Sequence, residues 1–184
     1  MPLVTHKNMS ENRILYDQNN NFVVGSWIRP IMKEHAILVT LNGGHILEFG
    51  FGLGIFSEEV QKIGVESHTI VENDPQRYSE LLKFAENYSN VIPIFDSWLN
   101  FESKIKYDGI FHDTNTSIDL FSLYVSKWAK EGAIISWFSP AKKEHALLNE
   151  FADRYIEIPI DMTEYEIYDS SFRDTYYLPL KIYK

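Results

Sequence analysis

Three glycines and two acids in the first half of the chain have the types and the spacing that bind a nucleoside. Glu48 precedes Gly50, Gly52 and Gly54, and Glu72 lies 22 positions after Gly50. In α/β folds a turn of this kind lets the backbone come close to a ligand, and an acid about 20 residues later accepts hydrogen bonds from ribose hydroxyls. These features together predict a site for a nucleoside-containing cofactor.

The spacing of the glycines distinguishes between cofactors. A dinucleotide site has the pattern G-x-G-x-x-G/A, whose last small residue lets the following helix pack closely on the strand. That position is Ile55 here, and the third glycine is Gly54, in the run E-F-G-F-G-L-G over residues 48–54. This run resembles the first motif of the class I S-adenosylmethionine-dependent methyltransferases. The resemblance implies that this run, Phe51 included, contacts the adenosyl and methionine parts of S-adenosylmethionine, which leaves as S-adenosylhomocysteine. The positive N-terminus of the helix after Gly54 suits the cofactor's carboxylate.

Further cofactor contacts are expected where two other strands end. Asn73 follows Glu72 directly, and Asp96, Ser97 and Trp98 follow the apolar run 91–95. The methyltransferase resemblance places the adenine near the second of these strand ends. Two roles are open for Trp98: its ring either stacks on the adenine or packs beneath the loop.

Asp113 is the candidate catalytic residue. It follows the strand expected over 107–112, with its apolar residues 109–111, and is expected to point into the cleft beside the transferable methyl group. Methyl transfer needs an acceptor atom held in line, roughly 3 Å from the methyl carbon. A carboxylate there can orient an amine or guanidine N–H and balance the charge that develops on nitrogen. The alternative is that Asp113 caps the following helix, in competition with Thr116 or Ser117.

Other polar residues near these strand ends have simpler interpretations. Thr114 and Asn115 follow Asp113 and are candidate substrate contacts. His112 alternates to the other side of the strand, so packing is expected, and His45 lies at the start of its strand, far from the ligand edge. No metal site is expected, because no H-x-x-x-H or D-x-D pattern and no cysteine set is present.

These residues need parallel strands that end at one edge of a sheet. The periodicity predicts helices at 30–42, 54–64, 75–85, 116–130 and 140–153, and strands at 45–49, 67–72, 91–95, 107–112, 133–138, 154–161 and 174–182. Alternation of strands and helices indicates an α/β fold with a doubly wound parallel sheet. The methyltransferase resemblance further implies that this sheet is a Rossmann-like methyltransferase sheet of seven strands with a terminal antiparallel hairpin. Residues 1–28 are expected to form a polar arm or lid, and residues 29–184 a single methyltransferase domain.

Composition narrows the class of partner. The net charge is −9 and no run of lysine and arginine is present, which disfavours nucleic acid as substrate. No apolar run approaches the roughly 18 residues of a membrane span, and residues 1–11 lack a signal-peptide core. We therefore expect no membrane partner, a cytoplasmic location, and a monomer or homodimer. The absence of cysteine excludes disulfides and thiol chemistry.

A narrower resemblance rests on five blocks of sequence. They are W-I-R-P-I-M at 27–32, G-G-H-I-L-E-F-G-F-G-L at 43–53, V-E-N-D at 71–74, V-I-P-I at 91–94 and Y-D-G-I-F-H-D-T at 107–114. Together they resemble guanidinoacetate N-methyltransferase and its arginine-methylating relatives, with a weaker similarity at Tyr176-Tyr177. The resemblance implies that Glu72 binds the ribose, that Trp98 borders the adenine and that Asp113 holds a guanidinium group.

One position departs from that family's W-E-T-P motif, in which an acid follows the tryptophan. Here Trp27 is followed by Ile28 and Arg29. Loss of one of two carboxylates that hold a guanidinium costs on the order of 2–5 kcal/mol of binding, so guanidinoacetate itself is not the expected acceptor. Arg29 then has two open roles, a bidentate contact to a substrate carboxylate or phosphate or a surface arginine at a helix start. Trp27, Arg29 and Met32 are the candidate substrate contacts on this side.

The sequence thus indicates a methyltransferase that acts on a small molecule, with nitrogen of an amine or guanidino group as acceptor. Methylation of an oxygen, or of an arginine side chain in a protein, is the enzymatic alternative. A non-catalytic relative that binds the cofactor and serves as an assembly module is the alternative from another class. The identity of the acceptor does not follow from the sequence.

Overall fold

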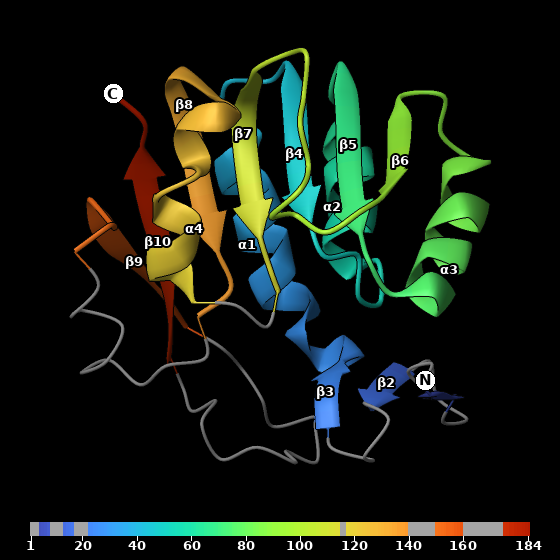
Figure 1. The fold of residues 1–184 in the computed structure, drawn as a ribbon. Helices are drawn as coiled ribbons and strands as arrows, with labels where there is room; N and C mark the ends of the chain where they lie inside the picture. Colours follow the sequence, from blue (N-terminus) through green and yellow to red (C-terminus); the bar gives the residue numbers. More distant parts are fainter. Residues whose placement is uncertain (1–3, 8–12, 17–21, 115–116, 140–149, 160–174) are drawn as a thin grey trace.

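The computed structural model describes residues 4–7, 13–16, 22–114, 117–139, 150–159 and 175–184 (Figure 1). In these ranges the strands are β1 (Val4–Lys7), β2 (Arg13–Tyr16), β3 (Phe22–Gly25), β4 (His45–Phe49), β5 (Ser67–Glu72), β6 (Val91–Phe95), β7 (Tyr107–His112), β8 (Ala129–Trp137), β9 (Arg154–Pro159) and β10 (Thr175–Ile182). The helices are the 3-10 turn η1 (Ser26–Ile28), α1 (Arg29–Val39), α2 (Ile55–Ile63), α3 (Pro75–Ala85), α4 (Ile118–Ser122) and the 3-10 turn η2 (Val125–Lys127).

The main sheet has seven strands in the order β6-β5-β4-β7-β8-β10-β9. Strands β6, β5, β4, β7 and β8 pair in parallel, and β10 runs antiparallel between β8 and β9. The chain moves outward from β4 to β6 and then returns to β7 beside β4. Such a reversal opens a crevice at the carboxyl ends of the strands, where ligands of doubly wound sheets bind. The predicted fold class and the terminal antiparallel hairpin are confirmed.

Local signals place the elements that lead to this crevice. Four strands, β4 to β7, begin and end at the predicted residues. Asp74 caps α3, because its side chain accepts hydrogen bonds from the backbone N–H groups of Gln76 and Arg77, and Pro75 occupies the first turn. Gly64, with a φ of 87°, ends α2. These caps fix how each helix leaves the sheet.

Helices cover both faces of the sheet, with α1 and α2 on one side and α4 on the other (Figure 1). Ile46 and Phe111 face α1 and α2, while Leu47 and Phe49 face an aromatic cluster around Trp128. Adjacent residues of β4 therefore lie in different cores, as the alternation of side chains along a strand requires. This alternation puts Glu48 on the same side as α2.

The predicted helix over 116–130 is wrong. Only α4 and the turn η2 form there, and β8 already begins at Ala129. Three apolar residues of this segment are nevertheless buried, since Phe121, Val125 and Trp128 are at most 3% exposed. Valine, tyrosine and tryptophan are weak helix formers, so their packing around Phe49 decides the backbone conformation. The predicted helix 140–153 lies largely outside the described residues.

The described residues of the N-terminal segment, 4–7, 13–16 and 22–28, contain three short strands and the turn η1. Strands β1, β2 and β3 form a separate antiparallel sheet, and β3 continues through η1 into α1 (Figure 1). Leu15 of β2 is 1% exposed and belongs to the same core cluster as Ile28 and Met32. At least this strand is therefore anchored on the domain.

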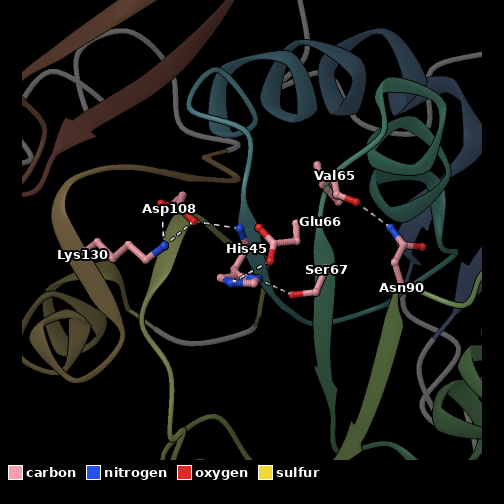
Figure 2. A network of polar contacts seen from close by, with 7 residues as sticks. All are labelled: His45, Val65, Glu66, Ser67, Asn90, Asp108 and Lys130. Atoms are coloured by element: carbon pink, nitrogen blue, oxygen red, sulfur yellow. Dashed lines mark hydrogen bonds and ion pairs between the residues drawn. The ribbon is translucent and has the colours of Figure 1, made fainter.

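A polar network ties the amino ends of the strands together (Figure 2). Lys130 donates two hydrogen bonds to the Asp108 carboxylate, which also accepts one from the His45 backbone N–H. The His45 ring contacts Ser67 at 2.8 Å and Glu66 at 3.6 Å. The prediction that His45 is structural is thus confirmed by its place at this edge. Among the described residues, no helix is long and apolar enough to cross a membrane.

Candidate cofactor and acceptor site

The glycine turn after β4 brings two strand ends into contact. Gly50 has a φ of 90°, and a Cβ atom there would collide with the backbone oxygen of Asp113. Only glycine lets these two segments touch. Gly52, with a φ of 53°, has no atom within 4 Å of its ideal Cβ position and faces open space. The turn is thus closed toward β7 and open where a ligand can approach.

Glu72 holds this turn in place. Its Oε2 accepts a hydrogen bond from the Phe51 backbone N–H at 2.9 Å. Its Oε1 accepts two more, from Asn73 at 2.8 Å and Asp74 at 2.7 Å. A carboxylate has about four acceptor positions, so one is left for a further donor, such as a ribose hydroxyl. Glu72 therefore both supports the glycine turn and presents an acceptor at the carboxyl end of β5.

Glu48 is buried beneath the turn. Its Oε2 accepts a hydrogen bond from Ser57 Oγ at 2.7 Å and lies 2.9 Å from His68 Nε2. Gln61 donates to the other ring nitrogen of His68, which places the His68 proton on Nε2, toward Glu48. Burial raises the pKa of Glu48, although His68 and Ser57 act in the opposite direction. The side chain is 1% exposed, yet it forms part of the cavity wall.

Asp113 lies at the end of β7, opposite the glycine turn. Its backbone N–H donates to Phe49 O at 2.9 Å, which fixes the backbone beside β4. Burial, followed by the negative charges of Glu48 and Glu72, raises the pKa of Asp113 to about 7. Within the described ranges, no group donates a hydrogen bond to its carboxylate. The capping alternative is wrong, because the Ser117 side chain caps α4.

A cavity joins these groups. It encloses about 290 Å³ of empty space, part of it open to solvent. Asp113 and Glu48 are its acidic residues, and the glycine turn forms one wall. The remaining wall is apolar, and its members come from η1, α1, the glycine turn, the start of α2 and β7: Ile28, Met32, Leu53, Ile55, Phe56 and Phe111.

The cofactor contacts predicted after β6 lie in two different environments. Asp96 donates its backbone N–H to Glu72 O at 3.2 Å and accepts from Ser97 N at 2.7 Å, so both lie beside the carboxyl end of β5. Trp98 is 5% exposed and sits in the aromatic core, with its ring 5.3 Å from that of His112. Of its two predicted roles, packing beneath the loop is the one that this burial favours.

Arg29 does not face the cavity. Its guanidinium donates to Glu58 and Glu59 of α2, each at 2.7 Å, and so ties the start of α1 to α2. A substrate-binding role is therefore not supported, and the alternative of an arginine at a helix start agrees with the structure. Met32, by contrast, lines the cavity as expected.

Of the other predicted substrate contacts, the structure describes the side chain of Thr114 but not those of Trp27 and Asn115. Thr114 Oγ1 lies 3.1 Å from His112 Nε2, and the His112 ring stacks on Phe121 at 4.2 Å, so packing of His112 is confirmed. Trp27 belongs to η1 by its backbone, its side chain is not described, and Asn115 lies outside the described residues. In the described parts of the chain, no group of three or more metal-ligating side chains comes together.

Sequence reasoning missed a buried network behind the cavity. Ser136 Oγ donates to Pro179 O at 2.6 Å, so it accepts from His35 Nδ1, 2.8 Å away. His35 Nε2 then accepts from the Tyr176 hydroxyl at 3.0 Å, and that hydroxyl accepts from the Ser139 backbone N–H at 2.9 Å. Burial lowers the pKa of His35 to about 3, so the ring is neutral. The network joins α1 to β8 and β10, across more than 100 residues of sequence, which no local pattern could have indicated.

Comparison with known proteins agrees with this geometry. The family model of guanidinoacetate N-methyltransferase matches residues 10–128. The protein arginine N-methyltransferase 2 of Candida glabrata is 25% identical over 178 residues, which cover 86% of this chain and 42% of that protein. The chain thus spans about two fifths of the length of this curated relative.

Solved methyltransferase structures have the same fold. The N-methyltransferase NodS from Bradyrhizobium japonicum WM9 aligns with a TM-score of 0.64 at 13% identity, over 85% of this chain and 96% of that one. The tRNA m1G37 methyltransferase of M. jannaschii aligns with a TM-score of 0.62 at 16% identity, over 99% of this chain and 57% of that one. At these identities the likeness concerns the fold alone.

Proposed function

The chain belongs to the guanidinoacetate N-methyltransferase family and carries a class I methyltransferase domain whose cofactor is S-adenosylmethionine, and on this basis we propose that it methylates a nitrogen atom of a small amine or guanidino acceptor. The observation that carries the proposal is the position of Asp113. Asp113 lines the cavity, together with the glycine turn and α1, and none of the described residues donates a hydrogen bond to its carboxylate.

The site has the features that this cofactor needs. Gly50 lets the turn pack against the backbone of Asp113, and Gly52 faces open space where a ligand can approach. Glu72 retains an acceptor position for a ribose hydroxyl. We propose Asn73, Asp96 and Ser97 as neighbours of the nucleoside. When bound, the cofactor supplies a methyl group on a positively charged sulfur. The acidic side chains around the cavity provide a favourable environment for that charge.

Asp113 would act on the acceptor. In its ionised form the carboxylate accepts a hydrogen bond from the acceptor's N–H and so orients the nitrogen lone pair toward the methyl carbon. During methyl transfer the carboxylate would stabilise the positive charge that develops on the acceptor nitrogen, and it would accept the proton that this nitrogen loses. The acceptor must be uncharged at the attacking nitrogen, and a carboxylate with a pKa near 7 suits that exchange at neutral pH.

The proposal is tested by incubating the protein with methyl-labelled S-adenosylmethionine and a metabolite extract, then with a panel of purified amines, guanidines, phenols and an arginine-containing peptide. We expect label in N-methyl products of small amines or guanidines. Label only in O-methyl products or only in the peptide would contradict it. Binding of the cofactor with no product in any pool would favour the non-catalytic alternative.

The N-terminal segment 1–28 is proposed as a lid. Phe22, Val23 and Val24 lie in β3, which leads through η1 to Ile28 at the cavity. Closure over the acceptor would exclude water from the transfer. Limited proteolysis should cut this segment in the free protein and cut it several-fold more slowly when S-adenosylhomocysteine and acceptor are both bound. Equal cleavage rates would contradict a lid.

Methylation of protein arginine is the second candidate, because the curated relative is an arginine N-methyltransferase. A net charge of −9 suits a basic peptide as well as a small cation, and it disfavours nucleic acid. The peptide in the panel separates the two candidates. A cytoplasmic location and a monomeric or homodimeric state stay predictions.

A further inference from the structure

The charges around the cavity have one sign. Glu48 and Asp113 line it, and Glu72 is close enough to both for its charge to raise their pKa values. Among the described residues, no lysine or arginine lines the cavity or forms an ion pair with any of these three acids. An acceptor that carries its own carboxylate would therefore find no cation in this part of the protein to balance it.

The arginine nearest in sequence to the cavity wall does not change this. Arg29 follows Ile28 directly, but both ends of its guanidinium are held by Glu58 and Glu59 on α2. Since two carboxylates already accept its hydrogen bonds at 2.7 Å, turning toward a ligand would break both of these ion pairs. Among the described residues, the arginine beside the cavity wall is therefore paired with α2 and does not bind an anionic acceptor.

The wall beside Asp113 is apolar. Ile28, at the end of η1, is 5% exposed, and Met32, in the first turn of α1, is 2% exposed. On the sheet side, Phe111 is 1% exposed and its ring stacks on Phe56 at 4.0 Å. Phe111 also contacts the neutral His35 ring at 4.8 Å, so this wall carries no charge. A polar or charged body of an acceptor would lose its hydration here without gaining a partner.

We propose that the acceptor is an amine or guanidine on an apolar body that carries no carboxylate, and that Ile28 and Met32 select that body while Asp113 holds the nitrogen. This inference rests on the proposed transfer to nitrogen. It assigns the substrate class from the juxtaposition of one free carboxylate, an apolar wall and the absence of a described cation.

The test compares ligands that differ by a single carboxylate. Binding of 2-phenylethylamine and of phenylalanine to the full chain, saturated with S-adenosylhomocysteine, is measured by calorimetry, with guanidinoacetate as a third ligand. We expect 2-phenylethylamine to bind at least about tenfold more tightly than the other two, as expected when a buried carboxylate lacks a partner. Calorimetry reports binding, so this readout does not depend on turnover.

Two neighbouring isoleucines give a matched pair of variants. Ile28→Ala removes part of the cavity wall, whereas Ile31→Ala removes the same atoms from a side chain that is 1% exposed in the core and does not line the cavity. Ile28→Ala should weaken 2-phenylethylamine binding about tenfold and bring it close to that of ethylamine. Ile31→Ala should leave the ratio of the two amines unchanged, and Ile28→Val provides a milder change if Ile28→Ala does not fold.

Each outcome decides the inference. Equal or tighter binding of phenylalanine or guanidinoacetate overturns it, as does the absence of binding by every amine or an equal effect of the two alanine variants. The proposed function is judged separately with methyl-labelled cofactor. Preferred binding of 2-phenylethylamine without methyl transfer supports the inference and contradicts the function. Methyl transfer to guanidinoacetate in preference to the apolar amine supports the function and contradicts the inference.

Discussion

Two aspartates, one near each end of β7, have opposite environments. Asp108, near the start of β7, accepts two hydrogen bonds from Lys130 and one from the His45 backbone N–H (Figure 2). Although burial acts to raise its pKa, these partners hold the pKa of Asp108 below its usual value. Asp113, just beyond the end of β7, has no such partner among the described residues, and burial with two nearby acids raises its pKa to about 7.

This difference indicates that the two edges of the sheet have different roles: charged residues at the amino edge stabilise the fold, and those at the carboxyl edge serve function. At the amino edge of the sheet, charged side chains find partners that the chain itself provides, so they support the folded state. At the carboxyl edge, Glu48, Glu72 and Asp113 converge without a lysine or arginine partner in the described ranges. Such an arrangement costs stability and is typical of a ligand site. The comparison therefore predicts that matched substitutions at the two edges have opposite effects.

The largest expected effect is on turnover. Asp113→Asn keeps the shape of the side chain and removes its charge, so kcat should fall about 10²- to 10³-fold, as for loss of one preorganised electrostatic partner. Affinity for S-adenosylhomocysteine should stay within about threefold of wild type, a few tenths of a kcal/mol. Steady-state kinetics with the best acceptor from the screen, together with calorimetry, measure both quantities.

Asp108→Asn is the control for this change, since it alters the same residue type at the other end of β7. It should leave kcat within about twofold of wild type. A similar loss of turnover in both variants would mean that the two edges do not differ in function, and an unchanged rate in Asp113→Asn would remove Asp113 from the mechanism.

The next effect concerns cofactor affinity. Glu72→Gln keeps one acceptor oxygen for the glycine turn but removes the charge from its hydrogen bonds. We expect binding of S-adenosylhomocysteine to weaken about 10- to 100-fold, in line with the 1.5–3 kcal/mol of a hydrogen bond to a charged group. Glu66→Gln, at the amino edge, should bind the product as the wild type does. Equal affinities in the two variants would argue against a ribose contact by Glu72.

The smallest effects are on stability, and their pH dependence has opposite signs. The raised pKa of Asp113 means that its protonated form stabilises the fold at low pH and that this stabilisation is lost as pH rises through about 7. Asp113→Asn should therefore be more stable than wild type at pH 8, by about 1–3 kcal/mol, and similar at pH 4. Asp108→Asn should lose about 1 kcal/mol at pH 8, where the ionised Asp108 is paired, and less as pH falls.

Denaturant unfolding of the two variants at pH 4 and pH 8 checks these signs. Lower stability of Asp113→Asn at pH 8 would show that the carboxylate supports the fold, contrary to the difference between the two edges.

Where the sequence predicted correctly, the signal was local. The parallel strands β4 to β7 are short apolar runs between glycines and caps, and Asp74-Pro75 starts α3 by hydrogen bonds within one turn. The carboxyl edge follows from these strands, because parallel strands end together. The sequence therefore predicts that the site residues at the strand ends lie at one edge of the sheet.

The failures depend on contacts between distant residues. The helix expected over 116–130 is replaced by short turns and the start of β8, because burial of Trp128 against Phe49 outweighs helical periodicity. Arg29 meets Glu58 and Glu59, about 30 positions away, and the Tyr176–His35 contact joins the ends of the chain. A single sequence carries no period or spacing that reveals such pairs.

One calorimetric measurement tests most directly whether the carboxyl group of Asp113 loses its proton when a positively charged ligand binds. S-adenosylmethionine is titrated at pH 7 into wild type and Asp113→Asn, in two buffers that differ in ionisation enthalpy, which gives the number of protons released on binding. With a pKa near 7, Asp113 is about half protonated before binding, so wild type should release about 0.5 proton more than the variant. Equal proton release by the two proteins would contradict the account.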